Sequence, residues 1–323
     1  MLLVFDNFPA DPAAPTTLPL KLVEAQAFPV SADAVNPADT AAPPPVPLRL
    51  GRPLVAAHRG ASLEAPENTM AAFRLAAELG ADYLELDVQR SSDGRLVVIH
   101  DATVDRTTDG SGEVGRLPYA VLRTLDAGSW FGKQYAGERI PSLDEVLDTY
   151  LGRTGLLLEL KNPDSYPGIV EQLSDELAVR LRRSPESASR LIVQSFDHGA
   201  VRRFHEKLPT VATAVLTSGR GELRLAKLRE YAGYASYVNA HIGDLTLKAS
   251  GRLHALGLKT FVWTVHTRRQ ARKLGHLGIS GVVTDNPAAF LPNAKQPDDT
   301  RQALRTPAKR IVRLLRHAAA RMA

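Results

Sequence analysis

Imidazole and charged side chains are concentrated at the ends of three short apolar runs between residues 54 and 101. The runs are Leu54–Ala57, Tyr83–Val88 and Leu96–Ile99. The polar side chains within or directly after them are His58, Arg59, Glu85, Asp87, His100 and Asp101. Apolar runs of this length, bounded by turn signals, are typical of strands buried on both faces. Since parallel α/β proteins build their sites at strand ends, this stretch predicts a catalytic or binding site.

Three carboxylates point to a site for a hard cation. Glu85 and Asp87 lie two residues apart on a predicted strand, so their side chains share one face. Buried carboxylates repel each other unless a proton or a cation lies between them, and Mg²⁺ and Ca²⁺ prefer oxygen ligands. Glu159 near the end of the run 155–160 supplies a third carboxylate, two residues before Lys161. The alternatives are solvated acids on a strand edge and a purely structural Glu159–Lys161 pair.

Two histidines and two positively charged side chains complete the predicted chemistry. His58 and His100 suit general acid and base catalysis, because imidazole changes its charge near neutral pH. A single histidine at a strand end is usually structural, but two beside three carboxylates favour catalysis. Arg59 suits bidentate binding of a phosphate or carboxylate, and Lys161 adds a point charge. Together these groups predict phosphoester chemistry with a divalent cation.

Other candidates are less directly tied to chemistry. Trp263 either lines the mouth of the pocket or belongs to the core, and Gln194 near the end of another strand is a candidate pocket residue. Asn68 is interpreted as the cap of the first helix and not as a substrate ligand.

Strands and helices alternate over residues 54–284, which is the order needed to position these groups. Further strands are predicted at 156–160, 191–195, 211–216, 237–240, 260–265 and 281–284. Helices are predicted in between, and Ser142 with Glu145 predicts a capping box for the helix 143–150. About eight core strands in about 240 residues predict a closed (β/α)8 barrel, a TIM barrel. A doubly wound open sheet is the alternative, because periodicity does not show closure.

The chain divides into three predicted parts. Residues 1–53 are a Pro/Ala-rich extension with one predicted strand near residues 19–28. Residues 54–292 form the barrel, with an insertion at residues 102–141 after the His100 strand, and residues 293–323 form a basic tail. The absence of cysteine excludes disulfides, thiolate metal sites and a cysteine nucleophile. No apolar run reaches the roughly 20 residues of a membrane span and the start is a poor signal peptide, so we expect a soluble, cytoplasmic protein.

The ordered motifs resemble those of the glycerophosphodiester phosphodiesterase family over about residues 53–292. They are His58-Arg59-Gly60, Pro66-Glu67-Asn68-Thr69, Glu85-x-Asp87, Val98-Ile99-His100-Asp101, DRTTDGSG from Asp105, Ile140-Pro141-Ser142-Leu143, Glu159-x-Lys161, Trp263-Thr264-Val265 and Thr284-Asp285-Asn286-Pro287. The resemblance implies a (β/α)8 barrel with a small inserted segment. It also implies hydrolysis of glycerophosphodiesters to glycerol 3-phosphate and an alcohol, through a cyclic phosphate.

Carried onto this chain, the resemblance assigns roles to individual residues. Glu85, Asp87 and Glu159 would hold the divalent cation, and Arg59 and Lys161 would bind the phosphate. His58 and His100 would be the acid and base. Two alternatives are a lysophospholipase D-like activity, disfavoured by the insertion because the similar venom phospholipases D lack one, and a catalytically silent barrel, disfavoured by the intact site.

The basic tail carries most of the positive charge of the chain. The formal net charge is +5, and the eight Lys/Arg and two Asp of residues 295–323 leave a net charge of −1 for the rest. This distribution argues against a nucleic-acid groove on the barrel. From Ala308 to Met322 apolar residues recur at helical spacing among basic ones, which predicts an amphipathic helix. Such a helix either docks on the barrel, the plainer interpretation, or lies on an anionic membrane surface.

The membrane hypothesis makes a measurable prediction. The full chain is expected to sediment with anionic vesicles at low salt and less at high salt, because each Lys/Arg near the surface contributes about 1 kcal/mol. A chain ending at Asn293 is the matched control and is expected to stay in the supernatant. Equal, negligible binding by both chains would contradict the hypothesis and leave the docked helix.

Overall fold

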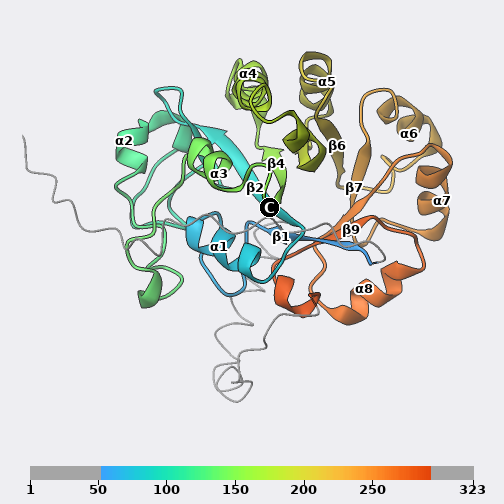
Figure 1. Cartoon of the computed structure of the whole chain (residues 1–323), viewed down its shortest axis with the longest axis horizontal. Coiled ribbons are helices and arrows are strands. Elements are labelled where there is room, and N and C mark those ends of the chain that lie inside the picture. The colour runs from blue at the N-terminus through green and yellow to red at the C-terminus, as the bar shows by residue number, and fades with distance from the viewer. Residues whose placement is uncertain (1–51, 292–323) are drawn as a thin grey trace, which may run out of the picture. The chain divides into compact units, whose positions relative to one another are not determined.

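Eight parallel strands close into a barrel in the computed structural model, which describes residues 52–291 (Figure 1). They are β1 (Leu54–His58), β2 (Tyr83–Arg90), β4 (Gly155–Leu160), β5 (Leu191–Ser195), β6 (Ala212–Thr217), β7 (Tyr237–His241), β8 (Phe261–Trp263) and β9 (Gly281–Thr284). Neighbours pair in this order, and β1 pairs with both β2 and β9. These two pairings close the barrel, so the barrel prediction is confirmed and the open sheet is excluded.

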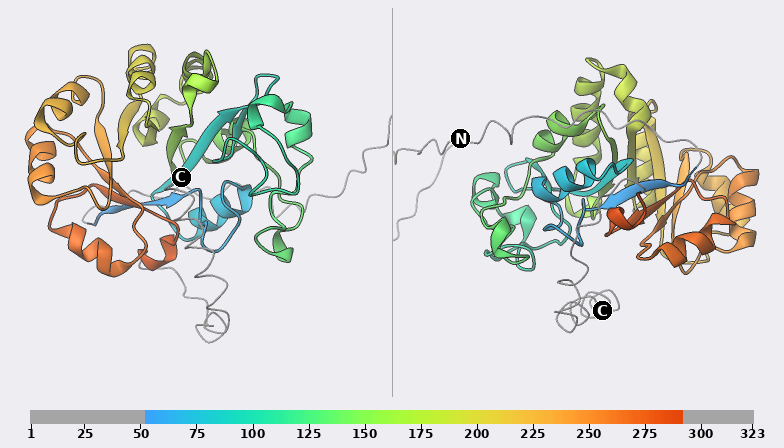
Figure 2. Two further views of the ribbon diagram at one scale, coloured as in Figure 1. Left: turned by 180° about the vertical axis from the view of Figure 1, so that it is seen from behind. Right: turned by 60° about the horizontal axis from the view of Figure 1, so that its bottom comes forward.

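Helices lie outside the barrel and cover its apolar outer surface (Figure 2). They are α1 (Met70–Glu78), α3 (Leu143–Tyr150), α4 (Ile169–Leu181), α5 (His198–Lys207), α6 (Leu225–Tyr231), α7 (Leu247–Ala255) and α8 (Arg268–Gly275). The predicted capping box is present: the Ser142 hydroxyl accepts from the Glu145 backbone N–H at 3.2 Å, and the Glu145 carboxylate accepts from the Ser142 N–H at 2.8 Å. Both ends of this interaction are local, so the sequence spacing was sufficient to predict it.

The third predicted strand is not a barrel strand. β3 (Leu96–Val98) is antiparallel to β2, with Val88 opposite Val98. β2 extends beyond the barrel to Arg90, and the chain turns and runs back along it. An antiparallel return needs only a short turn, whereas a parallel neighbour needs a long crossover. The hairpin therefore brings the chain back to Asp87, whose carbonyl accepts from the Ile99 N–H at 3.0 Å, and His100 follows directly.

The insertion at residues 102–141 packs around its own small core beside β3. Its elements include the short helix α2 (Tyr119–Leu122) and the 3₁₀ turns 114–116 and 133–135. The core consists of Val97, Ile99, Val104, Val114, Leu122, Ala127 and Ile140. Because Val97 and Ile99 belong to the β3 segment, the insertion is anchored to the same backbone that carries His100.

The barrel interior has an apolar layer below a mostly polar one. The apolar layer consists of Ala56, Tyr83, Leu157, Ile192, Ala214, Tyr237, Phe261 and Val283. The next inward position on each chain segment, two residues later, is occupied by His58, Glu85, Glu159, Gln194, Leu216, Asn239, Trp263 and Asp285. Alternation along strands turns every second side chain inward. The same alternation that fills the core thus gathers polar groups at the carboxyl ends of the strands.

Several predictions concern residues outside those described. The strand near residues 19–28 and the tail helix 308–322 lie there, and the proposed boundaries of the three parts stay a prediction. Between residues 52 and 291, none of the helices combines the length and the apolar character that a membrane span requires.

Candidate active site

A cavity of about 270 Å³ lies at the carboxyl ends of the barrel strands. Its lining consists of His58, Arg59, Glu85, His100, Glu159, Lys161, Gln194, Phe196, Leu216, Trp263, Thr264 and Val283. Every residue predicted for the site lines this cavity except Asp87, which is 1% exposed and lies against Arg59 and Lys161. The tertiary structure therefore brings together groups that are up to 205 residues apart, from His58 to Trp263.

The three predicted metal-binding carboxylates form one buried cluster. One oxygen each of Glu85, Asp87 and Glu159 lies within 4.8 Å of the others. Glu85 Oε2 accepts from the Arg59 backbone N–H at 2.9 Å, and Lys161 Nζ lies 2.7 Å from Glu159 Oε1. Asp87 Oδ1 is buried and, among the described residues, has no hydrogen-bond partner. Since a buried acceptor needs a partner, this oxygen beside two other carboxylates fits a divalent cation.

Burial, together with the charges inside and around the cluster, sets the protonation of these carboxylates. Burial raises the pKa of Glu85 well above its usual value, and the negative charges of Asp87 and Glu159 raise it further. Burial also acts to raise the pKa of Asp87, but the positive charges of His100, Arg59 and Lys161 outweigh it and hold that pKa far below normal. Without a cation, the folded protein therefore keeps a proton on Glu85 more readily than an exposed glutamate would.

His58 is oriented by a carboxylate from the last strand connection. Its Nδ1 lies 2.5 Å from Asp285 Oδ1, and the ring lines the cavity. Burial and the nearby Arg59 lower the pKa of His58, which favours the neutral imidazole at pH 7. Asp285 was not singled out for a role by the sequence analysis. Its position in the sequence could have indicated a site residue. Asp285 lies two residues after Val283, which faces the barrel interior, and side chains two residues apart lie on the same face.

His100 is held in the same way by its neighbour in sequence. Nδ1 of His100 lies 2.6 Å from Asp101 Oδ1, so Nε2 is the ring nitrogen left for the substrate. Burial lowers the pKa of His100, although the charge of Asp87 acts to raise it. Gln89 holds the backbone here, since its Nε2 lies 2.7 to 3.0 Å from the carbonyl oxygens of Ile99, His100 and Asp101. In each histidine, Nδ1 thus lies against a carboxylate, and Nε2 is the nitrogen left to contact a substrate.

The loop before α1 supports the acidic cluster, and one prediction there was wrong. Thr69, not Asn68, caps α1, with its hydroxyl accepting from the Ala72 N–H at 3.3 Å. Asn68 has a left-handed backbone (φ 56°), and its amide donates to Asp87 Oδ2 at 2.8 Å. That backbone turn aims Asn68 into the barrel, where the Asp87 carboxylate is the better partner for an amide. Arg59 Nη1 donates to Glu67 Oε1 at 2.8 Å, and its Nε lies 3.2 Å from Asp87 Oδ2.

Gln194 and Trp263 form the opposite wall and share a partner. Gln194 Nε2 donates to Glu85 Oε1 at 3.4 Å, and Asn239 Nδ2 donates to Gln194 Oε1 at 2.8 Å. The Trp263 indole N–H donates to the Asn239 carbonyl at 3.0 Å, so the indole is held in place. Phe196 packs edge-on against it with 5.5 Å between ring centres. Both predicted pocket residues thus line the cavity, while Asn239, which links them, was missed.

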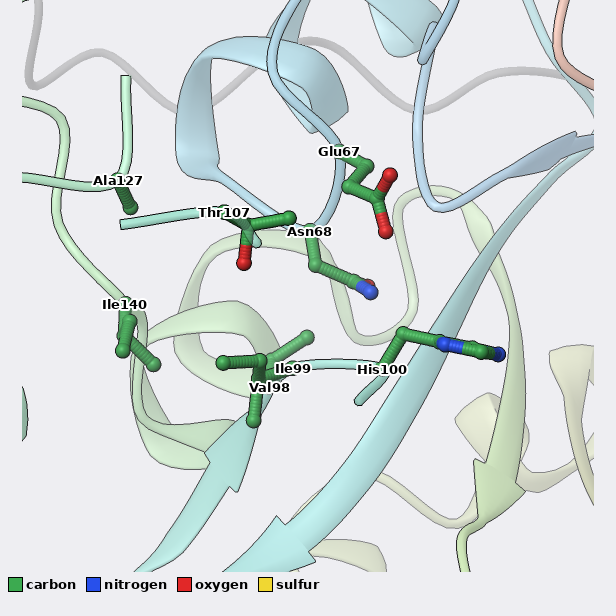
Figure 3. Close-up of a pocket in the computed structure, with 8 residues that line it drawn as sticks. All are labelled: Glu67, Asn68, Val98, Ile99, His100, Thr107, Ala127 and Ile140. Atoms are coloured by element: carbon green, nitrogen blue, oxygen red, sulfur yellow. The ribbon is translucent and has the colours of Figure 1, made fainter. Parts of the chain in front are cut away.

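A second, much smaller cavity lies where the insertion meets the barrel. Figure 3 shows Glu67 and Asn68 on one side and Val98, Ile99 and Ile140 on another, with His100 at its edge. Its volume is about 10 Å³, close to the lower limit for one water molecule. The insertion therefore packs closely against the segments that carry His100 and Glu67.

Fold and site together define the class of this protein. A (β/α)8 barrel with an acidic cluster, two histidines bound to carboxylates, and the cationic side chains of Arg59 and Lys161 at its carboxyl-end mouth has the groups that a phosphoric diester hydrolase needs. Residues 58–289 match the model of the glycerophosphoryl diester phosphodiesterase family. Because this match covers most of the chain, the protein belongs to that family.

Individual relatives agree with this assignment. YhdW of Bacillus subtilis is 43% identical over 242 residues, which is 75% of this chain and 98% of YhdW. A glycerophosphodiester phosphodiesterase of Caldanaerobacter subterraneus is 38% identical over 244 residues, covering 74% of this chain and 96% of its own. A phosphodiesterase of Oleispira antarctica, solved with the product sn-glycerol 3-phosphate, superposes with a TM-score of 0.63 at 31% identity, covering 73% of this chain and 94% of that one.

Proposed function

We propose that the protein hydrolyses glycerophosphodiesters to glycerol 3-phosphate and an alcohol, in a reaction that requires a divalent cation. The observation that carries the proposal is the convergence of His58, His100 and the acidic cluster on one cavity, with Arg59 and Lys161 beside them. The family and the product bound to the Oleispira antarctica relative support this substrate class.

The cation would be held by Glu85, Asp87 and Glu159. When bound, Mg²⁺ or Ca²⁺ supplies positive charge that stabilises the phosphoryl oxygens. Lys161, whose ammonium group lies 2.7 Å from Glu159, and Arg59 add positive charge at the same end of the cavity. Arg59 is already paired with Glu67 and Asp87, so its contribution to the phosphate comes from a fixed guanidinium.

The two histidines divide the proton transfers between them. One imidazole takes the proton of the glycerol 2-hydroxyl while that oxygen forms a bond to phosphorus. The other gives a proton to the leaving alcohol oxygen as its bond to phosphorus breaks, which produces a cyclic phosphate. In the second half the roles reverse: water attacks phosphorus, the bond to the 2-oxygen breaks, and glycerol 3-phosphate remains. Asp285 and Asp101 fix which nitrogen of each ring faces the substrate.

The test is the release of glycerol 3-phosphate from a panel of diesters. The panel contains the choline, ethanolamine, glycerol and inositol glycerophosphodiesters. Lysophosphatidylcholine, assayed by release of choline, is included for comparison. We expect turnover of the glycerophosphodiesters, loss in excess chelator, and recovery with Mg²⁺ or Ca²⁺. Release of choline from lysophosphatidylcholine that is faster than turnover of the glycerophosphodiesters would favour the lysophospholipase D-like alternative. No turnover with any diester would favour a silent barrel.

Replacement of Asp285 by asparagine tests the orientation of His58. The variant keeps the shape but loses the negative charge that stabilises the imidazolium and selects its tautomer. We expect kcat to fall by about 10-fold to 10²-fold with a smaller change in KM, because the substrate contacts are retained. Steady-state kinetics on a glycerophosphodiester measures this. Unchanged kcat in a folded Asp285→Asn protein would mean that the carboxylate is not needed to orient His58.

A further inference from the structure

Arg106, in the DRTTDGSG motif of the insertion, joins two carboxylates that belong to the site. Its Nε lies 2.5 Å from Asp101 Oδ2, and its Nη2 donates to Asp101 Oδ1 at 3.1 Å. Its Nη1 and Nη2 donate to the two oxygens of Glu67 at 2.8 and 2.7 Å. A guanidinium that binds two carboxylates, each through two contacts, fixes the orientation of both, because its donors form a rigid fork.

Each of these carboxylates holds a residue of the cavity. Asp101 Oδ1 lies 2.6 Å from His100 Nδ1, and Glu67 Oε1 accepts from Arg59 Nη1 at 2.8 Å. The resulting chain runs His100–Asp101–Arg106–Glu67–Arg59 and joins both sides of the site. The side chain of Asp101 is 30% exposed, so water competes for it. Within residues 52–291, Arg106 is the one arginine or lysine that forms an ion pair with Asp101. Charges on the two arginines also keep the pKa of Glu67 near 2 against the effect of burial, so this carboxylate stays ionised.

We infer that Arg106 is a positioning residue of the active site: it holds Asp101 against His100 and Glu67 against Arg59. The insertion is thereby part of the catalytic framework and not only a cover on the barrel. This inference rests on the catalytic role proposed for His100. The two contacts of Arg106 have separate expected consequences. Loss of the His100 arm, meaning the Arg106–Asp101–His100 contacts, lowers kcat. Loss of the Arg59 arm, meaning the Arg106–Glu67–Arg59 contacts, raises KM for the phosphodiester.

The first experiment compares two arginines of the insertion. Arg106→Gln is expected to lower kcat by about 10²-fold, the loss that a misplacement of about 1 Å can cause. Arg123→Gln is the matched control. Its side chain is 39% exposed, against 31% for Arg106, and it links the insertion to Glu145 of α3 at 2.6 Å without touching the site. Both variants are expected to lose similar thermal stability, but only Arg106→Gln to lose activity.

Arg106→Lys keeps the charge and loses the fork, so its kcat is expected to lie between those of the wild type and Arg106→Gln. It also serves as the test variant if Arg106→Gln does not fold. Activity equal to that of the Arg123→Gln control in a folded Arg106 variant would overturn the inference and leave Arg106 as a structural link only.

The second experiment asks whether Arg106 acts through His100. In a double-mutant cycle, adding Arg106→Gln to His100→Ala is expected to change kcat by less than about 2-fold, since the arm no longer has an imidazole to position. The rise in KM from the Arg59 arm is expected to remain. Losses in kcat that multiply would overturn the inference while the role of His100 stands. Near-wild-type kcat in His100→Ala alone would refute the proposed function of His100, and the inference with it.

Discussion

His58→Ala and His100→Ala are each expected to lower kcat by at least about 10²-fold while the barrel stays folded. A fall in kcat of this size is expected when a general acid or base is lost. Both rings line the cavity, and each binds a carboxylate through Nδ1, at 2.5 Å for His58 and 2.6 Å for His100. Alanine removes the proton-transfer group without adding bulk. The measurement is kcat on a glycerophosphodiester, with circular dichroism and melting temperature as checks of folding.

A third histidine provides the control for this prediction. His205 on α5 does not line the cavity, so His205→Ala is expected to keep full activity. The comparison of two substrates then separates the roles. The second substrate is the p-nitrophenyl diester of glycerol phosphate, which keeps the attacking 2-hydroxyl and whose p-nitrophenolate leaves without a proton. The variant that lacks the general acid is expected to recover activity on it, and the variant that lacks the base is not. Near-native turnover in either folded variant would remove that histidine from the mechanism.

Glu85→Gln and Asp87→Asn are each expected to abolish the proposed cation-dependent activity. Each replacement removes one of three buried carboxylates whose oxygens lie within 4.8 Å of one another, and a hard cation is bound mainly by such charged oxygens. The measurements are activity across a titration of Mg²⁺ or Ca²⁺ and the melting temperature with and without the cation. Glu206→Gln, exposed on α5, is the matched control and is expected to behave like the wild type.

Thermal stability provides a readout of this site that does not depend on turnover. A cation at 100 times its Kd stabilises a folded protein by about 2.7 kcal/mol, so the wild type is expected to melt higher when Mg²⁺ or Ca²⁺ is added. Glu85→Gln is expected to show no such rise. In chelator this variant is expected to melt at or above the wild type, because it removes a buried carboxylate whose ionisation is opposed by burial, Asp87 and Glu159. Wild-type activity that persists in excess chelator would refute the cation site.

Within one segment, the sequence predicted the local structure and which side chains share a face. Glu85 and Asp87 were placed on one face because side chains alternate along any strand, and the Ser142–Glu145 capping box spans only one helical turn. The alternation of strands and helices, from which the barrel was predicted, is also a local signal. Apolar periodicity within each short segment shows which face of a strand or helix is buried. The error at Asn68 also arose locally, because Asn68 and Thr69 are both good caps and the left-handed backbone at Asn68 decided between them.

The sequence by itself therefore predicted the strands that form the barrel, although it added Leu96–Ile99 to them, and the faces of their side chains. It also supplied nine candidate residues for the site, whose roles stay a prediction. Only the tertiary structure decided that the barrel closes, that β3 runs antiparallel, and that Asp285 meets His58 from 227 positions along the chain. It also decided that Arg106 bridges Glu67 and Asp101. The physical reason is range: steric preferences and side-chain alternation act over a few residues, whereas strand pairing and the partners of buried charges depend on which distant segments are buried together.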